Sequence, residues 1–380
     1  MRSRVVVIAF GLSLFLPQGP AHAAEPDERW LTHLRFPVNL AWVPDGTLFY
    51  AEKETGNIRM VVDGELDPDP VVHVDVSVSF ETGLLGLAVH PDWPDEPWIY
   101  AYRSDPATGR NELLRFRVEE GRATDRETLF DRIGTSSNHN GGELSFGSDG
   151  MLYLTTGDGT EEESSQDPTD PRGKILRFTP DGGVPPDNPI GGNPLYSLGH
   201  RNSIGLCVDP DTGELWQTEN GEPVDELNRI VAGDNYGWPV GQGAIEGGDF
   251  HDPVATLLDA APTGCAVWRG AVYFGSYTRG ELLRWPLGGG PDSAEVVSRF
   301  SSPVYDVSVG PDDRLYVTTD DTIWTLGSAS SPGETPSPEG TVAPDDPGTP
   351  GSKLGWPYLA AGVLLGLSLW LTMRRARRLR

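Results

Sequence analysis

The stretch Pro44-Asp45-Gly46-Thr47-Leu48-Phe49-Tyr50 decides the fold, because it joins a tight turn to a short strand. Asp, Gly and Pro favour turns, whereas β-branched and aromatic residues favour strands. The same combination recurs in altered form at His90-Pro91-Asp92 before Trp98-Ile99-Tyr100, Ser148-Asp149-Gly150 before Leu152-Tyr153-Leu154, Asp209-Pro210-Asp211 before Glu214-Leu215-Trp216, Arg269-Gly270-Ala271-Val272-Tyr273-Phe274, and Pro311-Asp312-Asp313-Arg314-Leu315-Tyr316-Val317. The chain therefore contains six weakly similar units.

The spacing of these units predicts the architecture. They follow one another at intervals of about forty to sixty residues, which is the range for four-stranded propeller blades. Long helical periodicity is missing outside the two ends of the chain. We therefore expect an all-β, six-bladed β-propeller over residues 30–327. A β-sandwich is the alternative, but it would not need six near-equivalent turns.

The beginning of the chain has the features of a secretory signal peptide. Arg2 and Arg4 give a positive start, Val5 to Leu16 form an apolar stretch, and Ala21-His22-Ala23 matches a cleavage site. The apolar stretch is short for a membrane helix, and a proline follows it. We expect residues 1–23 to be removed on export.

The end of the chain has the features of a membrane anchor. Residues 328–353 are rich in Pro, Gly and Ser and predict an extended linker. Residues 354–373 carry no charge and are long enough to cross a bilayer. Residues 374–380 form a basic tail, which the positive-inside rule places in the cytoplasm. We expect a single-pass protein of the cell membrane with its propeller outside the cytoplasm.

The composition excludes one class of partner. The formal net charge is −27, with 56 acidic against 29 basic side chains, so nucleic acid is an unfavourable ligand. The chain has two cysteines, Cys207 and Cys265, in apolar stretches far apart in sequence. A disulfide in an exported protein and two buried small hydrophobic residues are both open interpretations.

His139 is the strongest candidate for chemistry. It lies in Asn138-His139-Asn140-Gly141-Gly142, a glycine-flanked turn before a strand, and loops of this kind carry functional residues. Histidine titrates nearest to neutral pH, which suits a general base. Taken alone, a histidine is more often structural. Two further motifs, around Arg201-Asn202 and around Asn220-Gly221-Glu222, come from another repeat and would meet His139 at one mouth of a propeller channel.

With Glu81-Thr82-Gly83-Leu84-Leu85-Gly86 upstream, these motifs resemble the glucose/sorbosone dehydrogenase family, whose best-known members are soluble quinoprotein sugar dehydrogenases. The likeness extends from about Leu34 to Leu326. Further motifs that carry it are Gly173-Lys174-Ile175-Leu176-Arg177, Asp187-Asn188-Pro189 and Asn235-Tyr236-Gly237-Trp238-Pro239. The resemblance implies the same six-bladed fold.

The resemblance also implies an activity: oxidation of the anomeric hydroxyl of an aldose to the lactone, with hydride transfer to pyrroloquinoline quinone (PQQ) beside a Ca²⁺ ion. His139 matches the base that takes the hydroxyl proton. The positions that match cofactor contacts are Glu81, Asn138, Arg201, Asn202 and Asn220. Gly221 and Glu222 match the turn that holds the catalytic Ca²⁺, and Glu226 with Tyr236 resembles a second, structural Ca²⁺ site.

The sequence departs from the family late in the chain. Thr278 stands where the family has a lysine, and Pro303 and Tyr305 stand where it has arginines, all of which contact cofactor carboxylates. Fewer cations would bind a tricarboxylate more weakly. Two functions therefore remain: a membrane-tethered sugar dehydrogenase that passes electrons to a respiratory acceptor, or a propeller that binds a glycan or protein without redox turnover. A Ca²⁺-dependent lactonase is a third interpretation. The order of the motifs argues against it, because that order matches the dehydrogenases.

Overall fold

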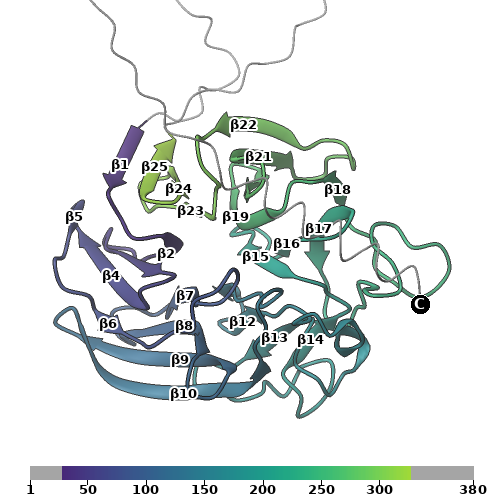
Figure 1. Ribbon diagram of the computed structural model, residues 1–380, viewed down its shortest axis with the longest axis horizontal. Coiled ribbons are helices and arrows are strands. Elements are labelled where there is room, and N and C mark those ends of the chain that lie inside the picture. The colour runs from purple at the N-terminus through teal and green to yellow at the C-terminus, as the bar shows by residue number, and fades with distance from the viewer. Residues whose placement is uncertain (1–27, 327–380) are drawn as a thin grey trace, which may run out of the picture. The chain divides into compact units, whose positions relative to one another are not determined.

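A computed structural model describes residues 28–326 and shows six sheets arranged radially around a channel (Figure 1). Blade 1 consists of β2 (Pro37–Trp42), β3 (Leu48–Glu52), β4 (Asn57–Val62) and β5 (Glu65–Leu66), with β6 (Val72–His73) also paired to β4. Blade 2 consists of β7 (Leu84–Val89), β8 (Trp98–Asp105), β9 (Arg110–Glu119) and β10 (Arg122–Gly134). Blade 3 consists of β11 (Leu144–Phe146), β12 (Leu152–Thr155), β13 (Lys174–Phe178) and β14 (Leu195–Leu198).

The second half of the ring repeats this order. Blade 4 consists of β15 (Ser203–Val208), β16 (Leu215–Glu219), β17 (Val224–Ile230) and β18 (Ala255–Leu258). Blade 5 consists of β19 (Pro262–Trp268), β20 (Ala271–Ser276), β21 (Glu281–Pro286) and β22 (Glu295–Arg299). Blade 6 consists of β23 (Asp306–Val309), β24 (Leu315–Thr318), β25 (Thr322–Leu326) and β1 (Glu28–Thr32). One short 3₁₀ helix, η1 (Glu162–Gln166), lies between β12 and β13.

The six sequence repeats coincide with one feature of the blades. Each repeat forms the turn from the first, innermost strand of a blade to its second strand. The turn at 44–47, for example, joins β2 to β3, which pair antiparallel with Trp42 opposite Leu48. The expected six-bladed, all-β architecture is therefore confirmed.

The ring is closed by the beginning of the described chain. β1 pairs antiparallel with β25, with Glu28 opposite Thr325 and Thr32 opposite Thr322. Blade 6 thus takes its outermost strand from one end of the sequence and its three other strands from the opposite end. This pairing joins two segments that lie almost 300 residues apart, so the ring closes only after the whole domain has been made.

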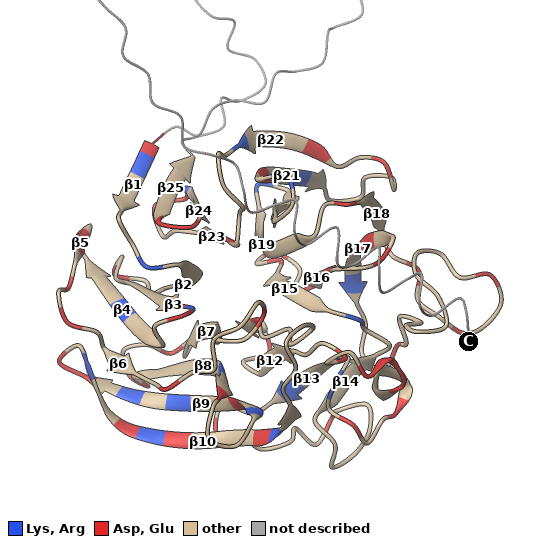
Figure 2. Ribbon diagram, viewed as in Figure 1, with Lys and Arg blue, Asp and Glu red and all other residues tan. Residues whose placement is uncertain are grey.

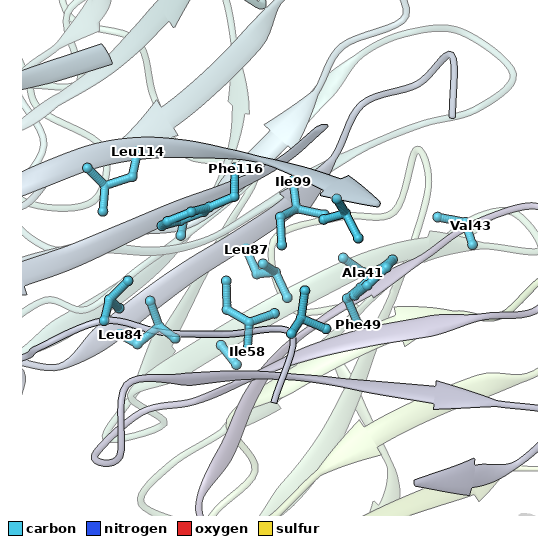
Figure 3. Close-up of a cluster of buried hydrophobic side chains, with 14 residues drawn as sticks. Ala41, Val43, Phe49, Ile58, Leu84, Leu87, Ile99, Leu114 and Phe116 are labelled. Atoms are coloured by element: carbon cyan, nitrogen blue, oxygen red, sulfur yellow. The ribbon is translucent and has the colours of Figure 1, made fainter. Parts of the chain in front are cut away.

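Apolar side chains fill the spaces between adjacent blades. Figure 3 shows the cluster between blades 1 and 2, where Phe49 and Ile58 face Leu87, Ile99 and Phe116. All five side chains are at most 3% exposed. Burying a side chain of this size contributes about 1.5–3 kcal/mol, so such clusters hold the blades in fixed positions.

Charged side chains gather at the edge of the ring, especially along β9 and β10 (Figure 2). Most of β10 is exposed, and acidic and basic residues are interspersed along it. An outermost strand has unpaired backbone groups that invite pairing with another chain, and charges on such a strand oppose that pairing.

A disulfide links two neighbouring blades. Cys207 of β15 and Cys265 of β19 are bonded, with their Cα atoms 5.6 Å apart. The structure thus decides between the two interpretations of the cysteines in favour of a disulfide. The bond closes a loop over a sequence separation of 58 residues, which in the chain-entropy model stabilises the fold by about 4 kcal/mol.

Three expected segments lie outside the described residues: the signal peptide (1–23), the linker (328–353) and the membrane span with its basic tail (354–380). Within residues 28–326, the structure has no helix that is long and apolar enough to cross a membrane.

We expect the double substitution Cys207→Ala with Cys265→Ala to lower the free energy of unfolding by up to about 4 kcal/mol, because it removes the loop constraint on the unfolded chain. Urea unfolding monitored by circular dichroism measures this change. A thiol reductant should lower the stability of the unsubstituted protein to the same level and leave the double variant unchanged. Equal stability of reduced and oxidised protein would contradict the assignment.

Candidate functional site

A cavity of about 630 Å³ opens at one mouth of the channel. All six blades contribute to its lining, among others through Asn39, Glu81, Gly141, Asn220, Thr278 and Tyr305. Loops and strand ends from distant parts of the sequence therefore meet here, as expected for the ligand site of a propeller.

The turn that carries His139 is held in a conformation unusual for a side-chain-bearing residue. The φ angle of His139 is 58°, in the left-handed region. Asn140, which is 2% exposed, anchors the turn by donating from Nδ2 to the carbonyl oxygens of Ser136 (2.7 Å) and Glu81 (3.1 Å). A Cβ on Gly157 would come within 2.2 Å of the carbonyl oxygen of His139, so only glycine permits this approach.

A buried carboxylate orients the His139 ring. Nδ1 of His139 lies 2.7 Å from Oδ1 of Asp158, which is fully buried. Asp158 also accepts hydrogen bonds from Nε1 of Trp238 (2.9 Å) and the backbone N–H of Thr160 (2.7 Å). A carboxylate only accepts hydrogen bonds, so Nδ1 of His139 carries the proton. Nε2 is then the nitrogen that remains to receive a proton from a substrate.

Glu81 connects this turn to two other blades. Its Oε2 atom accepts hydrogen bonds from the backbone N–H of His139 (2.5 Å) and from Nδ2 of Asn202 (3.1 Å). Asn202 in turn accepts from the backbone N–H of Gly141 at 3.3 Å. The predicted site residues Glu81, His139 and Asn202 therefore form one hydrogen-bonded group across blades 2, 3 and 4.

Arg201 lies beside this group. Its Nη1 atom donates to the backbone carbonyl of Asn220 (2.9 Å), and its guanidinium lies 5.4 Å from the centre of the Trp238 ring. The backbone carbonyl of Arg201 accepts from the N–H of Asp158 at 2.8 Å. Trp238 thus contacts both the partner of His139 and the predicted cofactor arginine.

The predicted calcium turn follows β16 and faces the cavity. The Oδ1 atom of Asn220 is buried without a hydrogen-bond partner among the described residues, and Asn220 lines the cavity. Gly221 donates its N–H to Asp225 (3.0 Å), and the Glu222 carboxylate lies 3.9 Å from Arg201. A buried amide oxygen without a hydrogen-bond donor is a ligand that suits Ca²⁺.

The second predicted calcium pair lies elsewhere in blade 4. Glu226 accepts hydrogen bonds from the N–H of Gly243 (2.6 Å) and from Nδ2 of Asn228 (3.1 Å), and burial, with the charge of Glu219, raises its pKa to about 7. Tyr236 stacks on His200 with ring centres 4.7 Å apart. Neither Glu226 nor Tyr236 lines the cavity.

The remaining predicted positions are also placed. Asn138 is half-buried next to His139 in the same turn. Thr278 and Tyr305 line the cavity, whereas Pro303 does not. The hydroxyl of Tyr305 donates a hydrogen bond to Asp320 at 2.7 Å, and this contact within the propeller fixes the side chain.

Three residues at the site escaped the sequence analysis: Asp158, Trp238 and Lys53. Asp158 lies in Gly157-Asp158-Gly159 just after β12, the strand that pairs with the one following His139, and this position is a signal that points to it. Lys53 lines the cavity with 9% exposure. Its ammonium donates to the carbonyl oxygen of Phe80 at 3.1 Å, and burial lowers its pKa.

We expect Glu81→Ala to lower the free energy of unfolding by about 1–3 kcal/mol, because it leaves the N–H of His139 and the amide of Asn202 without their acceptor. Glu81→Gln should lower the free energy of unfolding by less, since its side-chain carbonyl oxygen still accepts these hydrogen bonds. Urea unfolding of the two variants measures the difference. If Glu81→Ala lowered the free energy of unfolding no more than Glu81→Gln, the Glu81 side chain would not be what connects the three blades.

Comparisons with known proteins identify the family of the chain. Residues 34–326 match the family model described as Glucose / Sorbosone dehydrogenase. An uncharacterized protein of Synechocystis is 30% identical over 341 residues, covering 76% of this chain and 82% of the relative. Quinoprotein glucose dehydrogenase B of Acinetobacter calcoaceticus is 33% identical over 245 residues, which cover 55% of this chain and 51% of that relative.

A solved structure agrees as well. The PQQ-bound aldose sugar dehydrogenase of Streptomyces coelicolor superposes with a TM-score of 0.75 at 34% identity, covering 80% of this chain and 98% of that one. The family model spans nearly the whole described propeller, including the His139 turn, Arg201 and the Asn220 turn. The chain belongs to the glucose/sorbosone dehydrogenase family.

Proposed function

We propose that this chain is a quinoprotein sugar dehydrogenase that oxidises the anomeric hydroxyl of an aldose to the lactone, with PQQ and Ca²⁺ as cofactors. The observation that carries the proposal is the pair of His139 and buried Asp158, 2.7 Å apart, held beside a cavity to which all six blades contribute. The pair leaves Nε2 of His139 as the base, and two neighbours of His139 line the cavity: Gly141 in the same turn and Glu81, which accepts the His139 N–H. A positioned base contributes about 10²–10⁴-fold to such a reaction.

Different side chains around the cavity would bind the substrate and the cofactor. His139 would take the proton of the anomeric hydroxyl at Nε2, while Asp158 keeps the ring in the required tautomer. Arg201 and Asn202 would hold the cofactor, with Glu81 and Asn138 beside them. When bound, PQQ supplies the acceptor for the hydride that leaves the anomeric carbon.

Ca²⁺ would bind at the Asn220-Gly221-Glu222 turn. The buried, unpartnered Oδ1 of Asn220 supports this assignment, because an amide oxygen that lacks a donor is stabilised by a hard cation. Glu226 and Tyr236 stay a proposed structural site, separate from the cavity.

The charge of the cavity sets how the cofactor would be held. Lys53 is the one basic residue among the described residues that line it, whereas Glu54, Glu81 and Glu143 are acidic. Thr278 stands in the lining where the family has a lysine. We infer that Lys53 binds a cofactor carboxylate in this chain, from blade 1.

The features of the chain ends and the disulfide support a location outside the cytoplasm. Disulfides form and persist in oxidising compartments, and the bond between Cys207 and Cys265 fits such a compartment. With the proposed signal peptide and C-terminal anchor, the propeller would be tethered at the outer face of the cell membrane. A respiratory acceptor in that membrane would then reoxidise the cofactor.

We expect His139→Gln to lower sugar-dependent dye reduction by at least about 10²-fold in the full-length chain loaded with PQQ and Ca²⁺, because the substituted side chain cannot accept the proton. His73→Gln is the matched control, since His73 is exposed in blade 1, and it should keep full activity. PQQ binding, followed by absorbance, should survive in both variants. No PQQ uptake by the unsubstituted protein at micromolar concentration would contradict the proposal and favour the alternative of a propeller that binds a glycan or protein without redox turnover.

We expect Lys53→Met to weaken PQQ binding by about 10-fold or more, because it removes the one cation of the lining. Lys53→Arg should restore most of the affinity, since it restores the charge. Titration of each apoprotein with PQQ, followed by absorbance, measures the dissociation constants without turnover. Equal affinity of the methionine and arginine variants would show that the charge at position 53 does not hold the cofactor.

A further inference from the structure

Two carboxyl groups lie at the centre of the ring, and the proposed reaction uses neither. Glu143 directly precedes β11, the innermost strand of blade 3, and Asp306 is the first residue of β23, the innermost strand of blade 6. In a ring of six blades, blades 3 and 6 face each other across the channel. Glu143 also lines the cavity, so this part of the channel communicates with solvent.

Two consecutive residues of β2 hold both carboxyl groups. Nδ2 of Asn39 donates to Oε2 of Glu143 at 2.9 Å, and the backbone N–H of Leu40 donates to Oδ2 of Asp306 at 2.8 Å. The acids therefore reach the same short stretch of blade 1 from two sides of the channel. Blade 5 makes room for one of them, because a Cβ on Gly264 would lie 2.1 Å from Oδ1 of Asp306.

The negative charge of this pair has no basic partner. The groups that shift the pKa of Glu143 and Asp306 include no lysine or arginine of the described chain. Burial, and then the charge of Asp306, raises the pKa of Glu143 well above its ordinary value. Burial also raises the pKa of Asp306 to about 7. The two carboxyl groups thus contact consecutive residues of β2, and the donors there are neutral amides.

A third oxygen at the same place lacks a partner. Asn39 is 5% exposed, and its Oδ1 atom is buried without a hydrogen bond to any described residue. The amide nitrogen bonded to the same carbon contacts Glu143, so this oxygen lies at the acid pair. A buried acceptor without a donor costs about 1–3 kcal/mol, and a cation would relieve that cost.

We propose that Glu143, Asp306 and Asn39 form the protein part of a divalent-cation site at the centre of the ring, and that Ca²⁺ is the ion that fits it best. Ca²⁺ takes six to eight oxygen ligands, which include carboxylates, amide carbonyls and water in flexible geometries. Two carboxylates and one amide oxygen supply the protein ligands, and water from the cavity completes the shell. This site is distinct from the Asn220 turn and does not depend on PQQ.

Calorimetric titration of the chelator-treated, full-length chain with CaCl₂ at about pH 8, without PQQ or sugar, tests the proposal. Alkaline pH limits the competition between protons and Ca²⁺ for the two carboxyl groups, because metal ions bind the deprotonated form of their ligands. Glu143→Gln should remove one equivalent of bound Ca²⁺ or weaken it about 10-fold or more. Asn220→Ala should affect a different equivalent and leave the central one unchanged. MgCl₂ in place of CaCl₂ should bind more weakly, because Mg²⁺ demands strict octahedral geometry.

Asn39→Asp provides a second test that does not require the loss of a ligand. A third carboxylate should lower the melting temperature in chelator by repulsion, and added Ca²⁺ should raise it by more than in the unsubstituted protein. Equal Ca²⁺ stoichiometry and affinity in Glu143→Gln and unsubstituted protein would overturn the proposal. Because neither readout involves cofactor or turnover, failure of the dehydrogenase proposal would not alter the result.

Discussion

The pairing of β1 with β25 is the constraint on which the rest of the structure depends. The cavity lining and the hydrogen-bonded group around Glu81 combine residues from several blades, and these residues keep their positions only if the ring is closed. The His139 group spans blades 2, 3 and 4, and the acid pair meets across blades 3, 6 and 1. In an open ring, opposite blades would no longer be held at a fixed distance across the channel. Closure therefore matters most for contacts at the centre of the channel.

The features that the sequence predicts well are local. A turn such as Pro44-Asp45-Gly46 and the strand after it are set by neighbouring residues, so six such signals predicted six blades in the right places. The His139 turn, Arg201 and Asn220 were likewise singled out from contiguous motifs, and their roles stay predictions. The cysteines were left undecided, because the approach of β15 and β19 that permits the disulfide is a property of the assembled ring.

The features that the sequence did not predict depend on distant contacts. Asn39 contacts Glu143 across 104 positions of sequence, and Leu40 contacts Asp306 across 266. Trp238 reaches Asp158 across 80 positions. No local pattern marks such partners, since each is an ordinary residue of its own strand or loop. Asp158 is the exception, because its place at the end of β12 follows from the same hairpin that presents His139.

The balance of charge around the cavity connects the two proposals. With Thr278 where the family carries a lysine, the described lining contains a single lysine against three glutamates, and Asp306 lies just behind it. A site of this charge would repel a tricarboxylate in the absence of other cations. Bound Ca²⁺ at the Asn220 turn and at the central acid pair would supply that positive charge. On this argument, metal ions replace in this chain the fixed cations that its relatives build from side chains, and cofactor affinity should depend on Ca²⁺ more steeply than one site alone would require.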